Sequence, residues 1–302
     1  MAFRLGINTN FAINRIVEPE ELVRTVGEDV GLRYIQLTPE ILSPEWPAAV
    51  IARHVRDYVR AGERYGVRIS HTFTGAYTRL NHLAHPDADV RAHWVAWFKR
   101  WIDMAVDLGA RGTGSQLGIL SYRDDRDENR RSERLEQMRD NWRELARHGS
   151  ERGLEYLMWE PMSVRRELGH TIEVCRRQHD WINEDMPLAI HLNSDIDHGD
   201  VSSSDPADTD PYAWAEAFAA DSPVIHIKQS SMNKGGHWPF TARHNENGRI
   251  QPERLLETIR RGGGGDNELV FEFSFREREP DDSIAVQALR ESVEFWRPWI
   301  AD

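Results

Sequence analysis

The sequence predicts an α/β fold in which eight parallel strands close into a barrel, because short apolar runs alternate with longer amphipathic segments along the whole chain. Two further observations support this fold. Several amphipathic segments end in glycine directly before the next apolar run, the usual ending of a helix that leads into a strand. The chain has 302 residues and no linker-like stretch, so we expect one (β/α)8 TIM-barrel domain over residues 1–302.

Eight segments are predicted as strands because they are short and mostly apolar. The poorest is GTGSQL, whose glycines and polar residues have low strand propensity. The stretch LVFEFSF is a near-continuous apolar run, typical of a strand buried on both faces. A doubly wound open sheet is the alternative, but no G-x-G-x-x-G motif follows the first strand. The expected strands are residues 4–8, 34–37, 67–73, 112–117, 155–159, 188–193, 223–227 and 269–273.

The segments between the strands are predicted as helices from their apolar periodicity and their ends. One begins at Pro19 and has acidic residues in its first turn, as helix starts prefer. The charge run 123–134 (RDDRDENRRSER) is expected to be a solvated loop that leads into a helix. Further helices are expected over residues 48–65, 93–108, 134–152, 211–219, 252–261 and 283–299.

Charge and cysteine content narrow the functional classes. The formal net charge of −12 argues against a nucleic-acid partner, although a local basic pocket for an anionic small molecule is still compatible with it. Cys175 is the single cysteine, so no disulfide within the chain is expected. No signal-peptide pattern and no apolar run near the roughly 20 residues of a membrane helix is found, which makes a cytoplasmic protein without a membrane partner the expectation. Homo-oligomer formation is left open.

Side chains that can bind a metal lie at or just past the ends of the last four predicted strands: Glu160, Asp195, His226 and Glu272. Parallel barrel strands deliver their carboxyl ends to one face, so we expect these side chains to meet. Mixed oxygen and nitrogen ligands suit one divalent ion such as Mn²⁺, Mg²⁺, Co²⁺ or Zn²⁺. Such an ion would also explain Glu272, since an ionised carboxylate in an apolar strand is costly unless it is paired or binds a metal. Each residue considered alone has an alternative explanation to metal binding. The glutamate would pair with an arginine, and the histidine would be a hydrogen-bonded core residue.

The first half of the chain contributes neutral polar side chains on or at the ends of strands: Asn8, His71, Thr72 and Gln116. They suit the hydroxyls and carbonyl of a sugar, or they satisfy backbone groups. Three basic residues, Lys228, Lys234 and Arg243, follow the seventh strand, a region where barrels often bind phosphate. The expected partner is therefore a small sugar or sugar phosphate.

The chain resembles the xylose isomerase-like barrels, a superfamily of sugar and sugar-phosphate isomerases and epimerases. The resemblance rests on HPDADVRAHWVAWFKRWIDMAVDLGA before the fourth strand, WEP after the fifth, DIDH after the sixth, HIK at the seventh and FEF at the eighth. It implies Glu160, Asp195, His226 and Glu272 as metal ligands and His198 as a substrate contact.

The sequence departs from the superfamily pattern after the seventh strand. Many relatives have Pro-Gly-x-Gly there, whereas this chain reads HWPFTARHNENGRIQPERLL and keeps only Gly248-Arg249-Ile250, followed by Gln251 in place of an aspartate. The substrate contacts of that loop are therefore left open. Within the superfamily the chain looks most like the tetrulose-phosphate epimerases, which invert C3 of erythrulose 1-phosphate.

The chemistry expected from this set is epimerisation of a small ketose or ketose phosphate through a metal-stabilised enediolate. Glu160 and Glu272 would act as acid and base on opposite faces of the substrate. Return of the proton to the neighbouring carbon would instead give an aldose–ketose or hydroxypyruvate-type isomerase. A DNA-repair endonuclease of the same superfamily would need more ligands and a basic groove, and a non-catalytic sugar-phosphate-binding barrel would have a pocket without a tightly held ion.

Overall fold

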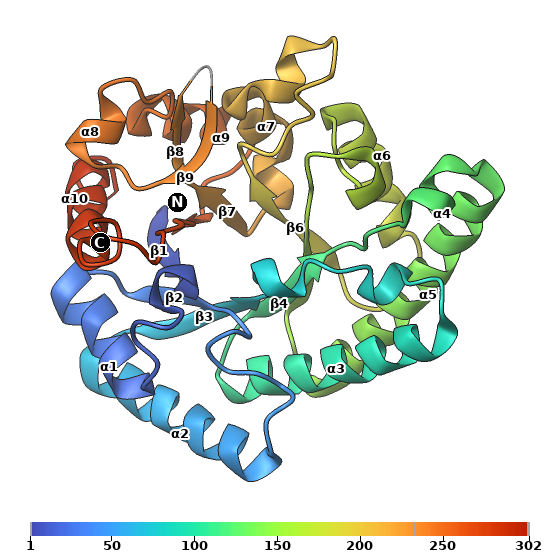
Figure 1. Ribbon diagram of the computed structural model, residues 1–302, viewed down its shortest axis with the longest axis horizontal. Helices are drawn as coiled ribbons and strands as arrows, with labels where there is room; N and C mark the ends of the chain where they lie inside the picture. The colour runs from blue at the N-terminus through green and yellow to red at the C-terminus, as the bar shows by residue number, and fades with distance from the viewer. Residues whose placement is uncertain (1, 232–233, 301–302) are drawn as a thin grey trace.

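The computed structural model describes residues 2–231 and 234–300, without the side chain of Lys234. Its centre is a closed barrel of parallel strands in the order β1-β10-β7-β6-β5-β4-β3-β2, surrounded by helices (Figure 1). The predicted (β/α)8 fold is confirmed, and each expected strand overlaps an observed one. The barrel strands are β1 (Arg4–Asn8), β2 (Tyr34–Leu37), β3 (Arg68–Phe73), β4 (Gly112–Gln116), β5 (Tyr156–Glu160), β6 (Ile190–Asp195), β7 (Val224–Ile227) and β10 (Glu268–Phe271).

The low-propensity strand β4 has a packing explanation. A Cβ on Gly112 would overlap the Tyr156 ring, and a Cβ on Gly114 would overlap the backbone of Met158. Both positions must lack a side chain because the neighbouring strand β5 approaches so closely. Tertiary packing therefore selects glycine where strand propensity disfavours it.

The helices confirm most of the predicted segments. Gly66 and Gly153 follow α2 and α5 in the left-handed conformation, with φ of 66° and 82°, and so end these helices as expected. In the described part of the chain, no helix combines the length and apolar character needed to cross a membrane. The α-helices are α1 (Pro19–Arg24), α2 (Ala48–Tyr65), α3 (Ala88–Asp107), α4 (Tyr122–Arg126), α5 (Glu128–Arg152), α6 (Ile172–Asn183), α7 (Pro211–Phe218), α8 (Ala242–Asn245), α9 (Pro252–Arg261) and α10 (Ala285–Trp296).

The charge run 123–134 was expected to be a solvated loop that leads into a helix; many of its side chains are exposed, but helix replaces most of the expected loop. Most of it is helical, and α5 already begins at Glu128 because Asp127 caps its first turn by accepting from two backbone N–H groups. Asp124 is buried and accepts a hydrogen bond of 2.7 Å from Arg130 Nη2. Pairing of opposite charges within the run stabilises helix where a loop was expected.

A hairpin that the sequence did not predict follows β7. Its strands, β8 (Gln229–Ser231) and β9 (Lys234–Trp238), pair antiparallel and lie beside β7 (Figure 1). The hairpin has few apolar residues and two glycines, so it lacks the alternation that marks a half-buried strand. It places His237 next to the end of the barrel at which the functional site is found.

Candidate metal centre and active site

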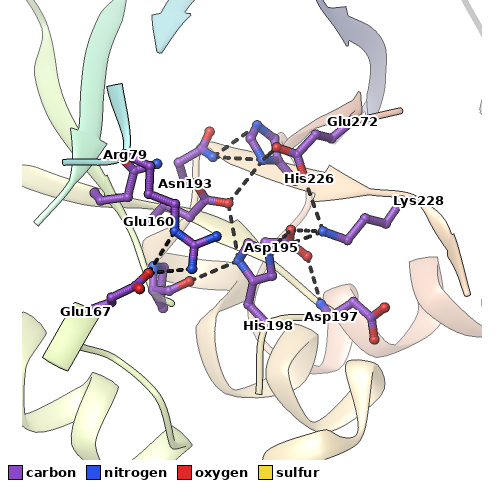
Figure 2. Close-up of polar contacts among 12 residues, drawn as sticks. Arg79, Glu160, Glu167, Asn193, Asp195, Asp197, His198, His226, Lys228 and Glu272 are labelled. Carbon is purple, nitrogen blue, oxygen red and sulfur yellow. Dashed lines mark hydrogen bonds and ion pairs between the residues drawn. The ribbon is translucent and has the colours of Figure 1, made fainter. Parts of the chain in front are cut away.

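Four side chains from adjacent strands meet at the carboxyl end of the barrel. Glu160 ends β5, Asp195 ends β6, His226 lies in β7 and Glu272 directly follows β10. One potential ligand atom from each lies within 4.8 Å of the others (Figure 2). These are the four residues that the strand-end pattern singled out, and the barrel brings all of them together. Three carboxylates and one imidazole form a ligand set suited to one divalent cation.

His226 is held in an orientation that suits a metal ligand. Its Nε2 lies 2.7 Å from Gln36 Oε1, which accepts a hydrogen bond when this nitrogen carries the proton, and 3.0 Å from Asn193 Nδ2. Gln36 is itself fixed, because its Nε2 donates to Asn193 Oδ1 over 2.8 Å. The other ring nitrogen, Nδ1, lies 3.5 Å from Glu160 Oε1 and 3.5 Å from Glu272 Oε1. A metal-binding histidine has this arrangement, with one nitrogen donating to a neighbouring group and the other facing the ion.

Glu160 provides the test of whether the site fits a cation. Its Oε1 atom is buried and accepts no hydrogen bond from the described residues. A buried carboxylate oxygen without a donor is costly, so it calls for a positive partner at that point. The ligand set therefore fits a bound divalent ion.

Lys228 is the main cation that the protein itself places in the cluster. Its side chain is 2% exposed, and its ammonium group donates to Asp195 Oδ2 and, over 3.2 Å, to Glu272 Oε2 (Figure 2). Burial alone would lower the pKa of Lys228, but Asp195 and Glu272 raise it above its ordinary value. Burial would likewise raise the pKa of Glu272, but Lys228 and His226 hold it well below its ordinary value. Lys228 was expected to reach a substrate phosphate, and the structure directs it toward two candidate ligands instead.

Two histidines stand at the more exposed side of the cluster. His198, expected as a substrate contact, places Nε2 at 3.1 Å from Asp195 Oδ2 and Nδ1 at 3.5 Å from Glu160 Oε1. His237 places Nδ1 at 3.1 Å from Glu272 Oε2, and its side chain is 41% exposed. His237 was not among the predicted site residues, because the hairpin that carries it was not predicted.

Two supporting residues, Gln36 and Asn193, were also missed. Both are buried polar side chains on otherwise apolar strands, in YIQL and LAIHLN. A polar residue in an apolar strand is the same signal that drew attention to Glu272, so both could have been found.

The polar residues expected in the first half of the barrel have different surroundings in the structure. Gln116 lies opposite Glu160 in the β4–β5 register, next to the cluster. Asn8 ends β1 and its side chain accepts from the N–H of Asn10, so it begins the helical turn Thr9–Ala12. The hydroxyl of Thr72 donates to Thr113 over 2.6 Å.

His71 does not join the cluster. Its Nε2 lies 2.8 Å from the Tyr156 hydroxyl and its Nδ1 lies 3.6 Å from Glu268 Oε1. Tyr156 and Glu268 are the first residues of β5 and β10, so His71 lies toward the amino ends of the strands. Because the strand is so short, the sequence alone could not show toward which end of the barrel the His71 side chain lies.

Of the basic residues expected to cluster after β7, Lys228 and Arg243 have different surroundings. Arg243 lies in α8 and lines a surface cavity of about 680 Å³ with Trp238 and Arg276. The Lys234 side chain lies outside the described residues. Of the two side chains that the structure describes, only Lys228 contacts the candidate ligands.

The fold and the site together define a (β/α)8 barrel with a candidate divalent-metal centre at the carboxyl ends of its strands. A family model described as "Xylose isomerase-like TIM barrel" matches residues 26–299. The chain is 48% identical over 301 residues to a D-erythrulose 1-phosphate 3-epimerase of Brucella abortus (strain 2308), an alignment that covers 99% of this chain and 97% of the relative. The chain belongs to the xylose isomerase-like TIM barrel family, as its motifs indicated.

Solved structures support the same conclusion. A proposed xylose isomerase from Rhodospirillum rubrum superposes with a TM-score of 0.86 at 25% identity, covering 98% of this chain and 99% of the other. The fold is also shared with a D-psicose 3-epimerase from Clostridium cellulolyticum H10, with a TM-score of 0.71 at 13% identity, covering 98% and 99% of the two chains. The expectation that the chain is an enzyme of the isomerase class is confirmed by its relatives.

Proposed function

We propose that the protein is a divalent-metal-dependent epimerase of a small ketose phosphate, and that it inverts C3 of D-erythrulose 1-phosphate. The observation that carries this proposal is the convergence of four ligand atoms within 4.8 Å at the carboxyl end of the barrel. The choice of substrate rests on the relative of that name, which is 48% identical over nearly the whole chain.

Glu160, Asp195, His226 and Glu272 would hold one divalent ion, from among Mn²⁺, Mg²⁺, Co²⁺ and Zn²⁺. Such an ion would supply the positive charge that stabilises the negative charge developing on the ketose when a proton leaves C3. Hydrogen bonding of His226 to Gln36 keeps the imidazole turned toward this point.

Inversion at C3 requires that a proton leave one face of the substrate and that another arrive on the opposite face. Glu160 and Glu272 come from β5 and the end of β10, which β6 and β7 separate in the barrel. A substrate bound between them would meet one carboxylate on each side. One carboxylate takes the C3 proton, the other delivers a proton to the opposite face, and the roles exchange in the reverse reaction.

The remaining polar residues near the cluster would orient the substrate. His198 stands beside Asp195 and Glu160 with a 14% exposed side chain, so it is placed to contact a substrate hydroxyl. Gln116 and Asn8 end the neighbouring strands of the first half and are proposed as further contacts, together with Lys234. His71 is left out of this set because its partners lie toward the other end of the barrel.

Hydrogen exchange at the substrate carbon tests the proposal directly. Mn²⁺-loaded protein is incubated in D₂O with D-erythrulose 1-phosphate and, in parallel, with erythrulose 4-phosphate. We expect deuterium at C3 of the 1-phosphate and formation of its C3 epimer. Deuterium at C1 of the 4-phosphate would point to an aldose–ketose isomerase instead. Binding of either compound without any exchange would identify a non-catalytic barrel.

A further inference from the structure

A buried lysine at the centre of a metal-ligand cluster is an unusual feature of this site. Lys228 follows His226 by two residues, and its side chain is 2% exposed. Removing an ammonium group from water is costly unless its partners compensate. Its carboxylate partners, Asp195 and Glu272, both belong to the candidate ligand set.

The ammonium group contacts two of the four candidate ligands. It reaches Oδ2 of Asp195 and Oε2 of Glu272, whereas Glu272 Oε1 faces His226 Nδ1 at 3.5 Å. The ring nitrogens of His198 and His237 lie 3.4 and 3.3 Å from Lys228 Nζ. The lysine is thus held between two candidate ligands and two histidines and does not extend freely into solvent.

The charges of the cluster balance only if the lysine is counted. Three ionised carboxylates contribute three negative charges, and a neutral imidazole contributes none. A divalent ion supplies two positive charges, and Lys228 supplies the third. The loaded centre is then formally neutral, although it lies in a chain with a net charge of −12.

We propose that Lys228 is a built-in second cation of the centre. It holds Asp195 and Glu272 in place, lowers the affinity of the site for the divalent ion by charge repulsion, and neutralises the loaded centre so that an anionic ketose phosphate can enter. The last of these roles rests on the function proposed above. The first two concern the metal site alone and can be measured without substrate.

The sign of the effect on metal affinity follows from Coulomb's law. A fixed positive charge close to the ion opposes its binding. Replacing Lys228 by methionine keeps an unbranched side chain, one atom shorter, and removes the charge. Carboxylates that no longer have the ammonium between them repel one another, and a metal ion relieves that repulsion. The K228M variant should therefore bind the ion more tightly, not less.

The test is a calorimetric titration of metal-free protein with Mn²⁺. We expect Lys228→Met to bind Mn²⁺ about tenfold more tightly than the unchanged protein, or more. The metal-free variant should melt at a lower temperature and gain more on addition of Mn²⁺. The matched control is Lys99→Met, which removes the same charge from α3, where Lys99 pairs with Glu144 on α5. Its Mn²⁺ affinity should not change.

Equal or weaker Mn²⁺ binding by folded K228M would overturn the inference. If the metal-free variant does not fold, the protein is folded in Mn²⁺ and its loss of the ion to EDTA is timed. Slower loss than from the unchanged protein supports the inference, and equal or faster loss refutes it.

A kinetic comparison separates this inference from the proposed function. In K228M, KM for D-erythrulose 1-phosphate should rise more than KM for unphosphorylated D-erythrulose. If the unchanged protein binds Mn²⁺ but converts neither ketose, the proposed function fails while the affinity result still stands. If KM rises equally for both compounds, the role in admitting the phosphate is wrong and the metal-affinity role is unaffected.

Discussion

The barrel contains two buried clusters of glutamate and histidine, and their hydrogen bonding differs. Toward the amino ends of the strands, Glu268 Oε1 accepts from Ser70 Oγ over 2.6 Å and lies 3.6 Å from His71 Nδ1. At the carboxyl ends, Glu160 Oε1 has no donor among the described residues. Glu268 begins β10 and Glu272 directly follows it, and yet the two glutamates belong to clusters of different kinds.

This difference shows that a buried carboxylate alone does not identify a functional site. The carboxylate of Glu268 has partners within the protein, Ser70 and His71. Its cluster can therefore be a structural element at the amino ends of the barrel strands. Around Glu160, three carboxylates converge and only Lys228 and the histidines offset them. Such an excess of negative charge fits a bound cation.

Removal of the metal should have the largest effect, and it should act on the cluster at the carboxyl ends of the strands. Dialysis of the protein against EDTA is expected to reduce epimerase activity to background, and Mn²⁺ should restore it. Mn²⁺ at about a hundredfold excess over Kd should also add about 2.7 kcal/mol to the free energy of unfolding. Activity assays and thermal melts with and without the ion measure both effects. Full activity in protein shown to be metal-free would contradict the proposed centre.

The next largest expected effect is a difference in kcat between variants of Glu272, which follows β10, and Glu268, which begins it. Glu272→Gln and Glu160→Gln should each lower kcat by about 10³-fold, because each removes an acid or base needed on one face of the substrate. Glu268→Gln makes the same change at the other end of the strand and should leave kcat unaltered in folded protein. Steady-state kinetics on the three purified variants provide the measurement. Substantial activity in E160Q or E272Q would refute the two-base scheme.

The clusters should also respond differently in stability. Glu268→Ala removes the partner of a buried hydrogen-bonded pair and should lower the free energy of unfolding by about 3 kcal/mol. In metal-free protein, Glu160→Gln removes one of three mutually repelling carboxylates and should leave stability unchanged or raise it. Urea unfolding of both variants, followed by circular dichroism, distinguishes these outcomes. A large loss of stability in metal-free E160Q would show that Glu160 is compensated like Glu268.

The smallest expected effect is a dependence of the Glu268 contribution on pH. Burial would raise the pKa of Glu268, but His71 and Ser70 lower it below the ordinary value of 4.5. A carboxyl group with a depressed pKa in the folded state stabilises the protein above its unfolded pKa, and this contribution disappears as the pH falls through the folded value. The stability difference between the unchanged protein and E268Q should therefore be constant near neutral pH and shrink below about pH 4.5. If the stability difference between the two proteins grew on acidification, the pKa of Glu268 would be raised in the folded state rather than lowered.

Much of the fold could be predicted because it depends on local patterns. The apolar runs of LVFEF and PVIHI, the glycines after α2 and α5, and the proline at the start of α9 all act over a few residues. The start of α5 was missed because its first turns are charged and its buried apolar side chains begin only at Met138. Ion pairs such as Asp124 with Arg130 stabilise this end of the helix. The hairpin β8–β9 was missed because its strands have no alternation to detect.

The candidate ligands could be predicted because a barrel brings strand ends together wherever those ends stand in the sequence. The same rule placed His71 incorrectly, since it lies in the middle of β3 and its depth depends on the stagger of the strands. The roles of Gln36 and His237 depend on contacts between segments far apart in the chain, with His226 and Glu272 respectively.

By itself, the sequence determined the order of strands and helices and the four side chains that the barrel would bring together, because periodicity and strand ends are local properties. Only the tertiary structure decided which buried glutamate is compensated and which is not. It also decided that Lys228 turns inward to the ligands rather than outward to solvent. Those outcomes depend on distances between atoms of different strands, and no single segment of the chain contains them.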